Sequence, residues 1–535
     1  MSSLTAEQLR RQVATLLVVR ASGHLEDSQR RYPRWELAND QLQRLLNDGV
    51  GGVILLGGSA VELQQRTQQL QRWSPQPLLL CADVEEGVGQ RFEGASWLVP
   101  PLALGRLYQG DPVQAISLTE RYGRCTADQA RRCGLNWVLG PVCDVNNNPD
   151  NPVINVRAWG EDPSTAGALA SAFQRGLAEG GVIGCAKHFP GHGDTSSDSH
   201  LDLPVIHHTL ERLERVELPP FQAAIAAGVD SVMTAHLLLP ELDPQRPATL
   251  STAVLTKLLR ETLDFKGLVV TDALVMDAIA ARYGAAEAAV LAFEAGADLI
   301  LMPGDADAAI DALCSAFGEG RLPLSRLDQS LQRRHQALAR TGSAPPPSAF
   351  PAIVTPEEHQ LERELVRRTL EINPAPKISA STGLNLVRVD SVLPSCHPLH
   401  GAAPALTLPA AQGFSTVLIH GQGVSPWQAN PEAPLALEQL GHGPVLLQLF
   451  LRGNPFRGTQ DSREPWPAAI QQLLDINRLA GVVVYGSPYL WDSLQPLLPE
   501  TLPAAYSPGQ MPEAQHQVLT QLLPGTGTRA GAFTD

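Results

Sequence analysis

Short apolar runs alternate with segments of helical pattern through the first 320 residues of the chain. Most of the runs are nearly continuous, as is typical of strands buried on both faces of a parallel sheet. The segments between them carry apolar residues at helical spacing; residues 36–49 end in a glycine, and residues 162–181 begin with Asp-Pro and end in Gly-Gly. The eight runs are 13–19, 51–56, 77–85, 135–145, 182–190, 229–239, 267–274 and 297–305.

Eight strands that alternate with helices predict an α/β fold, a (β/α)8 TIM-type barrel. A doubly wound open sheet is the main competitor for such a pattern. The barrel is favoured because the polar motifs of this region all fall at the ends of the predicted strands. We therefore predict a (β/α)8 catalytic domain over residues 1–341.

A Pro- and Ser-rich stretch, TGSAPPPSAFP, interrupts the pattern and predicts a linker over residues 342–355. Residues 356–535 then predict a smaller α/β sandwich domain that opens with a helix at 356–371. This part contains neither G-x-G-x-x-G nor G-x-x-x-x-G-K-[ST], so it has no nucleotide-binding fingerprint. Its predicted strands are 384–392, 414–423, 444–453 and 479–487, with helices at 431–441 and 465–477.

Composition narrows the class of partner. The formal charge is −15 and the isoelectric point about 5.4, which disfavours nucleic acid or an anionic membrane as a partner. No apolar stretch approaches the ~18 residues of a spanning helix. Arg10-Arg11 precede an apolar run, but Arg20 ends it after a few residues, so we interpret that run as the first strand, not as a secretory signal. A cytoplasmic protein is expected.

Chemically capable side chains gather where the predicted barrel strands end. Because the carboxyl ends of barrel strands meet at one face, these acids, bases and cations are expected to converge there. Scattered surface polarity would not concentrate at strand ends. The residues are Asp83 and Glu85 at the end of the third run, Arg157 after the fourth, Lys187 and His188 in the fifth, His236 in the sixth and Asp272 in the seventh.

The densest polar segment is KHFPGHGDTSSDSH, residues 187–200. In a locally extended loop, Asp198 and His200 would point the same way, so the carboxylate could orient the imidazole for proton transfer. A solvated glycine-rich loop without chemistry is a further interpretation. A divalent metal site is also open on these residues, with ligands drawn from His188, His192, Asp194, Asp198 and His200.

This segment resembles the signature of family 3 of the glycoside hydrolases, in its β-N-acetylhexosaminidase branch, and agrees with it at every fixed position. ADVEEGVGQRF (82–92) and NVRAWGEDP (155–163) are similar to further motifs of the family, in the right order. The similarity covers about residues 8–340. The second domain is more loosely similar to the C-terminal domain of two-domain members, most closely at AYSPGQMPEAQHQVL (505–519).

The resemblance implies a role for each matching residue. Asp272, after Thr271, matches the nucleophile of a retaining mechanism, and Asp198 with His200 matches the acid/base dyad. No cofactor and no metal are implied. The sequence departs from the branch at Ala273, where a second Asp is usual, and at Glu86, where a Gly is usual. The residues that match sugar-hydroxyl-binding positions are Asp83, Arg91, Arg157, Lys187 and His188.

The expected function is exo-hydrolysis of terminal β-linked N-acetylglucosamine, with peptidoglycan fragments as the substrate that the resemblance suggests. A β-glucoside or β-N-acetylglucosaminide phosphorylase and a β-glucosidase of the same family are the alternatives within the class. A non-catalytic sugar-binding protein is the alternative from another class. The expected partner is a carbohydrate, not nucleic acid or a membrane, and the expected state is a monomer or a weak homodimer.

Overall fold

The computed structural model describes residues 4–195, 203–342, 352–389, 399–419, 435–452 and 464–525. The chain divides into two compact units. The first comprises residues 1–97 and 104–358, and the second comprises residues 98–103 and 359–535. Residues 343–351 of the predicted linker lie outside the described residues, so the linker stays a prediction.

The first unit is built on eight parallel strands that follow one another in a ring. One sheet has the order β4-β3-β2-β1-β8 and the other β5-β6-β7. Single bridges, Trp137 to Ile183 and Val270 to Leu299, join the two sheets and close the ring, which confirms the predicted barrel. The strands are β1 (Leu17–Ser22), β2 (Gly52–Leu56), β3 (Leu79–Ala82), β4 (Trp137–Val138), β5 (Cys185–Phe189), β6 (Ser231–Thr234), β7 (Leu268–Val270) and β8 (Ile300–Leu301).

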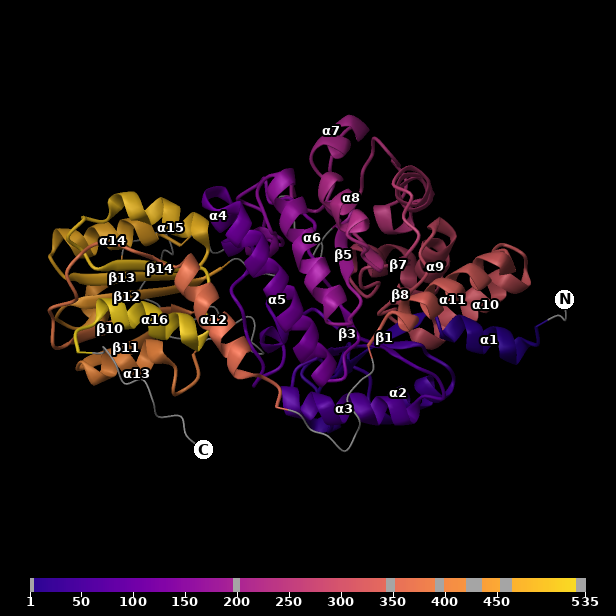
Figure 1. The fold of residues 1–535 in the computed structure, drawn as a ribbon, viewed down its shortest axis with the longest axis horizontal. Coiled ribbons are helices and arrows are strands. Elements are labelled where there is room, and N and C mark those ends of the chain that lie inside the picture. Colours follow the sequence, from indigo (N-terminus) through magenta and orange to yellow (C-terminus); the bar gives the residue numbers. More distant parts are fainter. Residues whose placement is uncertain are drawn as a thin grey trace. The chain divides into compact units, whose positions relative to one another are not determined.

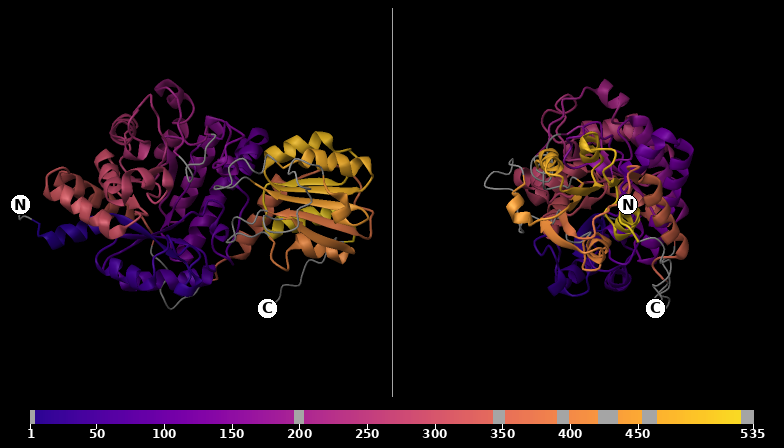
Figure 2. Two further views of the ribbon diagram at one scale, coloured as in Figure 1. Left: turned by 180° about the vertical axis from the view of Figure 1, so that it is seen from behind. Right: turned by 90° about the vertical axis from the view of Figure 1, so that its left-hand side faces the viewer.

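Helices lie outside this ring and cover it, as the views from the front and from behind both show (Figures 1 and 2). Their apolar faces pack on the strands, whose side chains are almost all buried. The helices of this region are α1 (Ala6–Ala14), α2 (Asn39–Asn47), α3 (Ala60–Trp73), α4 (Pro101–Gly110), α5 (Pro112–Arg132), α6 (Pro163–Glu179), α7 (Leu210–Arg215), α8 (Pro219–Ala226), a π-helix at Ala253–Thr262, α9 (Asp277–Ala295), α10 (Ala306–Gly318) and α11 (Leu324–Ala339). Most of the next helix, α12 (Pro356–Thr369), belongs to the second unit.

The first strand begins later than the sequence predicted. Residues 13 and 14 of the predicted strand 13–19 end helix α1, and β1 runs from Leu17 to Ser22. The reason is a capping box: the Thr5 side chain accepts from the Gln8 N–H, and the Gln8 side chain accepts from the Thr5 N–H. This motif fixes the start of the helix. The strand then continues through Arg20, which the sequence had suggested as the end of the run.

Strand β4 (Trp137–Val138) is shorter than the predicted run 135–145. Beyond it the backbone stays bonded to β5: the Cys185 N–H donates to the Gly140 carbonyl and the Lys187 N–H to the Pro141 carbonyl. The Cys143 N–H then donates to the Lys187 carbonyl. The irregular segment brings Asp144 to the carboxyl end of the barrel.

The second unit is a sheet of six strands in the order β11-β10-β12-β13-β14-β9, parallel except for β9. Two of these strands, β14 and β9, were not predicted, and a 3-10 turn at Leu437–Leu440 stands within the predicted helix 431–441. The elements are β9 (Glu371–Ile372), β10 (Gly383–Val389), α13 (Pro404–Ala411), β11 (Phe414–Ile419), β12 (Val445–Leu451), α14 (Trp466–Asp475), β13 (Leu479–Gly486), α15 (Pro488–Leu494), β14 (Ala504–Ser507) and α16 (Pro512–Leu522).

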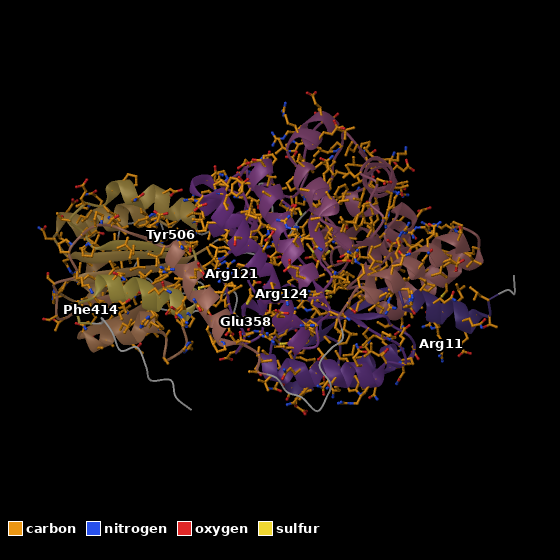
Figure 3. All side chains as sticks on the ribbon, viewed as in Figure 1. Arg11, Arg121, Arg124, Glu358, Phe414 and Tyr506 are labelled. Atoms are coloured by element: carbon orange, nitrogen blue, oxygen red, sulfur yellow. The ribbon has the colours of Figure 1, made fainter. Side chains whose placement is uncertain are left out.

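Alternate residues of this sheet enter two separate cores, which confirms the α/β sandwich. One core includes Trp466 and Trp491 of α14 and α15 together with Tyr506. The other includes Phe414 and residues of α13 and α16. The two helix pairs cover opposite faces of the sheet (Figure 1), and Figure 3 labels Phe414 and Tyr506.

Within the described ranges of both units, no helix combines the length and the apolar character needed to cross a membrane.

Candidate active site

A buried lysine joins two strand ends at the mouth of the barrel. Lys187 on β5 is 1% exposed, and its Nζ lies 2.8 Å from Asp83 Oδ1 and 2.6 Å from Glu85 Oε1, both just beyond β3. Glu85 also accepts two hydrogen bonds from Arg157, at 2.7 and 2.8 Å. Two cations and two carboxylates are thus held together, as buried charges require.

These contacts keep all four groups charged. Burial by itself would raise the pKa of Glu85, but Arg157 and Lys187 outweigh it and hold that pKa well below the usual value. Burial would lower the pKa of Lys187, but Asp83 and Glu85 raise it. The Asp83 side chain is 38% exposed, so its carboxylate is the member of the cluster that is most open to a ligand.

The two arginines of this site have different partners. Arg157 is the partner of Glu85, whereas Arg91 donates to the backbone carbonyl of Asp83 at 3.0 Å. Glu86 is buried and accepts from the Trp97 indole N–H at 2.9 Å. At position 86, where the family usually has a glycine, this chain therefore has a glutamate that makes a structural contact.

Asp144 is a member of the site that the sequence analysis missed. It is fully buried, and its Oδ2 lies 2.7 Å from His188 Nδ1. Its carboxylate also accepts from the backbone N–H of His188 and from that of His192. Because a carboxylate only accepts, His188 carries its proton on Nδ1 and presents Nε2 elsewhere. In the sequence, the signal that could have identified Asp144 was a single Asp near the end of the predicted run 135–145.

His192 is held as a neutral group. Burial lowers its pKa to about 4, although Asp144 and Asp272 act in the opposite direction. Its Nδ1 lies 2.9 Å from Thr195 Oγ1. His192 therefore contributes an uncharged ring to this part of the site.

Asp272 follows β7, and its backbone is held by a chain of polar side chains from β6 and from the segment that follows β6. The Asp272 N–H donates to Thr234 Oγ1 at 3.3 Å, and Thr234 Oγ1 lies 2.8 Å from Thr249 Oγ1. Thr249 Oγ1 lies 2.8 Å from His236 Nδ1, and His236 Nε2 lies 3.0 Å from the carbonyl of Ala273. His236 is fully buried. It thus holds the residue that follows Asp272.

The loop after β5 is fixed at both ends. At its start, the Asn151 amide donates to the carbonyls of His192 and Gly193, at 2.9 and 2.8 Å. A Cβ at Gly193 would collide with the backbone carbonyl of Val145, so only glycine fits this approach. At its end, Val205 pairs with Leu238 beyond β6.

Ion pairs connect the two ends of this loop. Asp194 Oδ2 lies 3.2 Å from His208 Nε2 and 3.5 Å from Arg212 Nη2. Glu217 accepts from Arg212 on the other side, at 3.2 Å. Asp194 is therefore occupied by loop contacts. We call Asp194, His208, Arg212 and Glu217 the loop clasp.

Asp198 and His200 lie outside the described residues, so their geometry stays a prediction. The other predicted residues Asp83, Arg91, Arg157, Lys187 and His188 come together at the carboxyl ends of β3 to β5, and Asp272 stands at the same end of the barrel beyond β7. Among the described residues, no group of three or more His, Cys, Asp or Glu side chains is arranged to hold a metal ion.

Comparison with known proteins fits this architecture. The model of the glycosyl hydrolase family 3 N-terminal domain matches residues 8–336. The chain belongs to glycosyl hydrolase family 3. The model of the bacterial family 3 C-terminal domain matches residues 377–524 in the second unit. The protein is thus a two-domain member of a family of glycoside hydrolases.

Relatives and solved structures cover most of the chain between them. A β-hexosaminidase of Stenotrophomonas maltophilia (strain K279a) is 37% identical over 271 residues, 50% of this chain and 80% of the relative. A family 3 β-N-acetylglucosaminidase structure from Paenibacillus sp. str. FPU-7 has a TM-score of 0.80 and 29% identity, covering 97% of both chains. NagZ of Neisseria gonorrhoeae, solved with N-trifluoroacetyl-D-glucosamine, has a TM-score of 0.54 and 29% identity over 65% of this chain and 96% of its own.

Proposed function

We propose that this family 3 hydrolase removes terminal β-linked N-acetylhexosamine residues from glycans, with retention at the anomeric carbon. The observation that carries the proposal is the position of Asp272 at the carboxyl end of β7, at the same barrel mouth as the cluster formed by Asp83, Lys187 and Arg157. The similar β-hexosaminidase and β-N-acetylglucosaminidase support the choice of sugar.

In this mechanism Asp272 attacks the anomeric carbon and forms a glycosyl-enzyme, and the leaving-group oxygen takes a proton from His200. Asp198 holds the imidazole in the required tautomer. Water then attacks the same carbon, His200 accepts its proton, and the bond to Asp272 breaks. An imidazole titrates near neutrality without the raised pKa that a carboxylic acid would need.

The remaining residues hold the sugar. Asp83 accepts from hydroxyl groups, while buried Lys187 and Glu85 fix its direction. Arg91, Arg157 and His188 supply donors around it, and Asp144 orients His188. We propose peptidoglycan fragments as the natural source of the terminal sugar.

The test is hydrolysis of 4-nitrophenyl β-N-acetylglucosaminide by the wild type and by Asp272→Ala. We expect a loss of at least about 10⁴-fold for Asp272→Ala, because the nucleophile is removed. The matched control is Asp277→Ala, which removes an exposed carboxylate in the first turn of α9 and should stay near wild type. Comparable activity of Asp272→Ala and wild type would overturn the proposal.

Two further assays distinguish the proposed activity from the alternative activities within the family. Faster turnover of the matching β-glucoside would indicate a β-glucosidase. Formation of sugar 1-phosphate when inorganic phosphate is added would indicate a phosphorylase. His200→Ala should spare substrates with very good leaving groups, since these need no proton donor.

A further inference from the structure

A buried carboxylate stands beside the sugar-binding cluster and takes no part in the proposed mechanism. Glu86 is fully buried, and its Oε2 accepts a hydrogen bond from the Trp97 indole N–H at 2.9 Å. Its backbone N–H donates to Gln90 Oε1 at 3.0 Å. A buried carboxylate costs free energy unless donors meet it, so a fixed donor such as this indole decides where the side chain lies. Glu86 is thus tied to two later positions of the loop that follows β3.

Glu86 shares its backbone with a member of the cluster. The preceding residue, Glu85, lies 2.6 Å from Lys187 Nζ and accepts two hydrogen bonds from Arg157. The two successive side chains thus reach different partners, because Glu85 meets the cations of the site and Glu86 meets the indole of Trp97. Since a planar peptide unit joins the two residues, a shift of the backbone at Glu86 would move the Glu85 carboxylate relative to its cations.

The indole that holds Glu86 belongs to a segment that is itself fixed on helix α5. The Ser96 N–H donates to Gln129 Oε1, and Gln129 Nε2 donates to Ser96 Oγ, both at 2.9 Å. Gln129 is fully buried. The Gly89 N–H donates to the Ser96 carbonyl at 2.8 Å. Trp97 therefore offers its N–H from a segment whose own hydrogen bonds lie outside the sugar-binding cluster.

The same loop carries Arg91, the second arginine of the site. Its Nε donates to the Asp83 carbonyl at 3.0 Å. Arg91 directly follows Gln90, whose side chain accepts from the Glu86 N–H. The contacts of Glu86 thus hold the loop at two points, one next to Glu85 and one next to Arg91.

We propose that Glu86, held by Trp97, is a positioning residue that keeps the sugar-binding half of the site in place. This inference rests on the proposed function, in which the cluster around Asp83 holds the sugar. The nucleophile is fixed separately, because the N–H of Asp272 donates to Thr234 on β6. Loss of the contact between Glu86 and Trp97 should therefore weaken sugar binding and leave the chemical step largely intact.

The test is steady-state kinetics of the full chain on 4-nitrophenyl β-N-acetylglucosaminide, together with competitive inhibition by free N-acetylglucosamine. Trp97→Phe keeps an aromatic ring and removes the N–H, and Glu86→Leu removes the acceptor. We expect each substitution to raise KM and the inhibition constant of the free sugar about tenfold, with kcat within about threefold of the wild type. Glu86→Gln keeps an oxygen that accepts from the indole and should recover most of the lost affinity.

The matched control is Glu93→Gln, which changes an exposed carboxylate of the same loop and should behave as the wild type. Adding Trp97→Phe to Glu86→Leu should raise KM no further, because both substitutions remove one contact. Equal KM values for the Gln and Leu variants, or a lower melting temperature of Trp97→Phe without a change in KM, would overturn the positioning role. Turnover by the wild type reports separately on the proposed function. If it fails, calorimetric binding of N-acetylglucosamine to the same variants still decides the role of Glu86.

Discussion

At the scale of single residues, the hydrogen bonds around His236 explain how the backbone at Asp272 is fixed. His236 Nε2 donates to the Ala273 carbonyl, and its Nδ1 lies 2.8 Å from Thr249 Oγ1. The Thr249 hydroxyl also lies 2.9 Å from the Ala235 carbonyl and 2.8 Å from Thr234 Oγ1, which accepts from the Asp272 N–H. These contacts run from one side of Asp272 to the other.

His236 is therefore expected to act as a positioning residue. His236→Leu removes the donor to Ala273 and should lower kcat by about 10²-fold with a smaller change in KM, because the nucleophile loses its alignment. His236→Gln retains an N–H donor and should recover much of that loss. Equal kcat values for the Leu and Gln variants, at matched melting temperatures, would contradict the role. The readout is steady-state kinetics on 4-nitrophenyl β-N-acetylglucosaminide.

Residue types at strand ends allowed Asp83, Lys187, His188 and Asp272 to be predicted, because barrel topology alone brings such positions to one face. The pairing of charges was not predictable in the same way. Arg157 pairs with Glu85 because the loop after β4 folds back toward it. Asp144 pairs with His188 because an irregular segment brings the two together. Arg20 was interpreted as the end of an apolar run, because charged residues are rarely buried, but it lies inside β1.

At the scale of elements, the loop after β5 depends on contacts made by its two ends. The loop clasp joins Asp194, before the predicted dyad, to His208 and Arg212, after it. Asn151 and the close approach of Gly193 to Val145 fix the first end to the loop after β4. The sequence marked 187–200 as important, but it did not show that the partners of Asp194 lie beyond it.

Opening the loop clasp should slow the enzyme without removing a proposed reacting group. Arg212→Ala is expected to lower kcat/KM by about tenfold, because the loop loses part of the contact that sets its ends. Arg215→Ala removes an exposed arginine from the same helix α7 and should have no such effect. In a double-mutant cycle, Asp194→Asn and Arg212→Ala should be non-additive. Strict additivity of the two substitutions would argue against the clasp.

At the scale of the whole molecule, pH affects the stability of the second unit as well as that of the barrel. Glu362 on α12 is largely buried, and burial together with Glu513 raises its pKa to about 7, while Arg363 acts in the opposite direction. His359 Nδ1 lies 3.6 Å from its carboxylate. Because the folded pKa exceeds the unfolded one, the folded state holds more protons between about pH 4.5 and 7. Stability therefore falls as the pH rises through that window.

The substitution Glu362→Gln should remove this loss of stability at higher pH. We expect the variant to be more stable than the wild type at about pH 8, by at most about 3 kcal/mol, and to differ less at about pH 5. The measurement is the urea concentration at the midpoint of unfolding of the second unit, at both pH values. Glu500→Gln, at an exposed position, is the control. An equal gain from Glu362→Gln at both pH values would rule out the titration of Glu362 as the cause.

The antiparallel strand β9 has a practical consequence for anyone who shortens this chain. Its two residues pair with Ala505 and Tyr506 and cover the outer edge of β14, and Glu371 accepts from the Trp491 indole. A fragment that starts at residue 377, where the family model of the second domain starts, would leave that edge bare. Bare edges recruit other chains, so expression of the second unit alone calls for a start before Glu371.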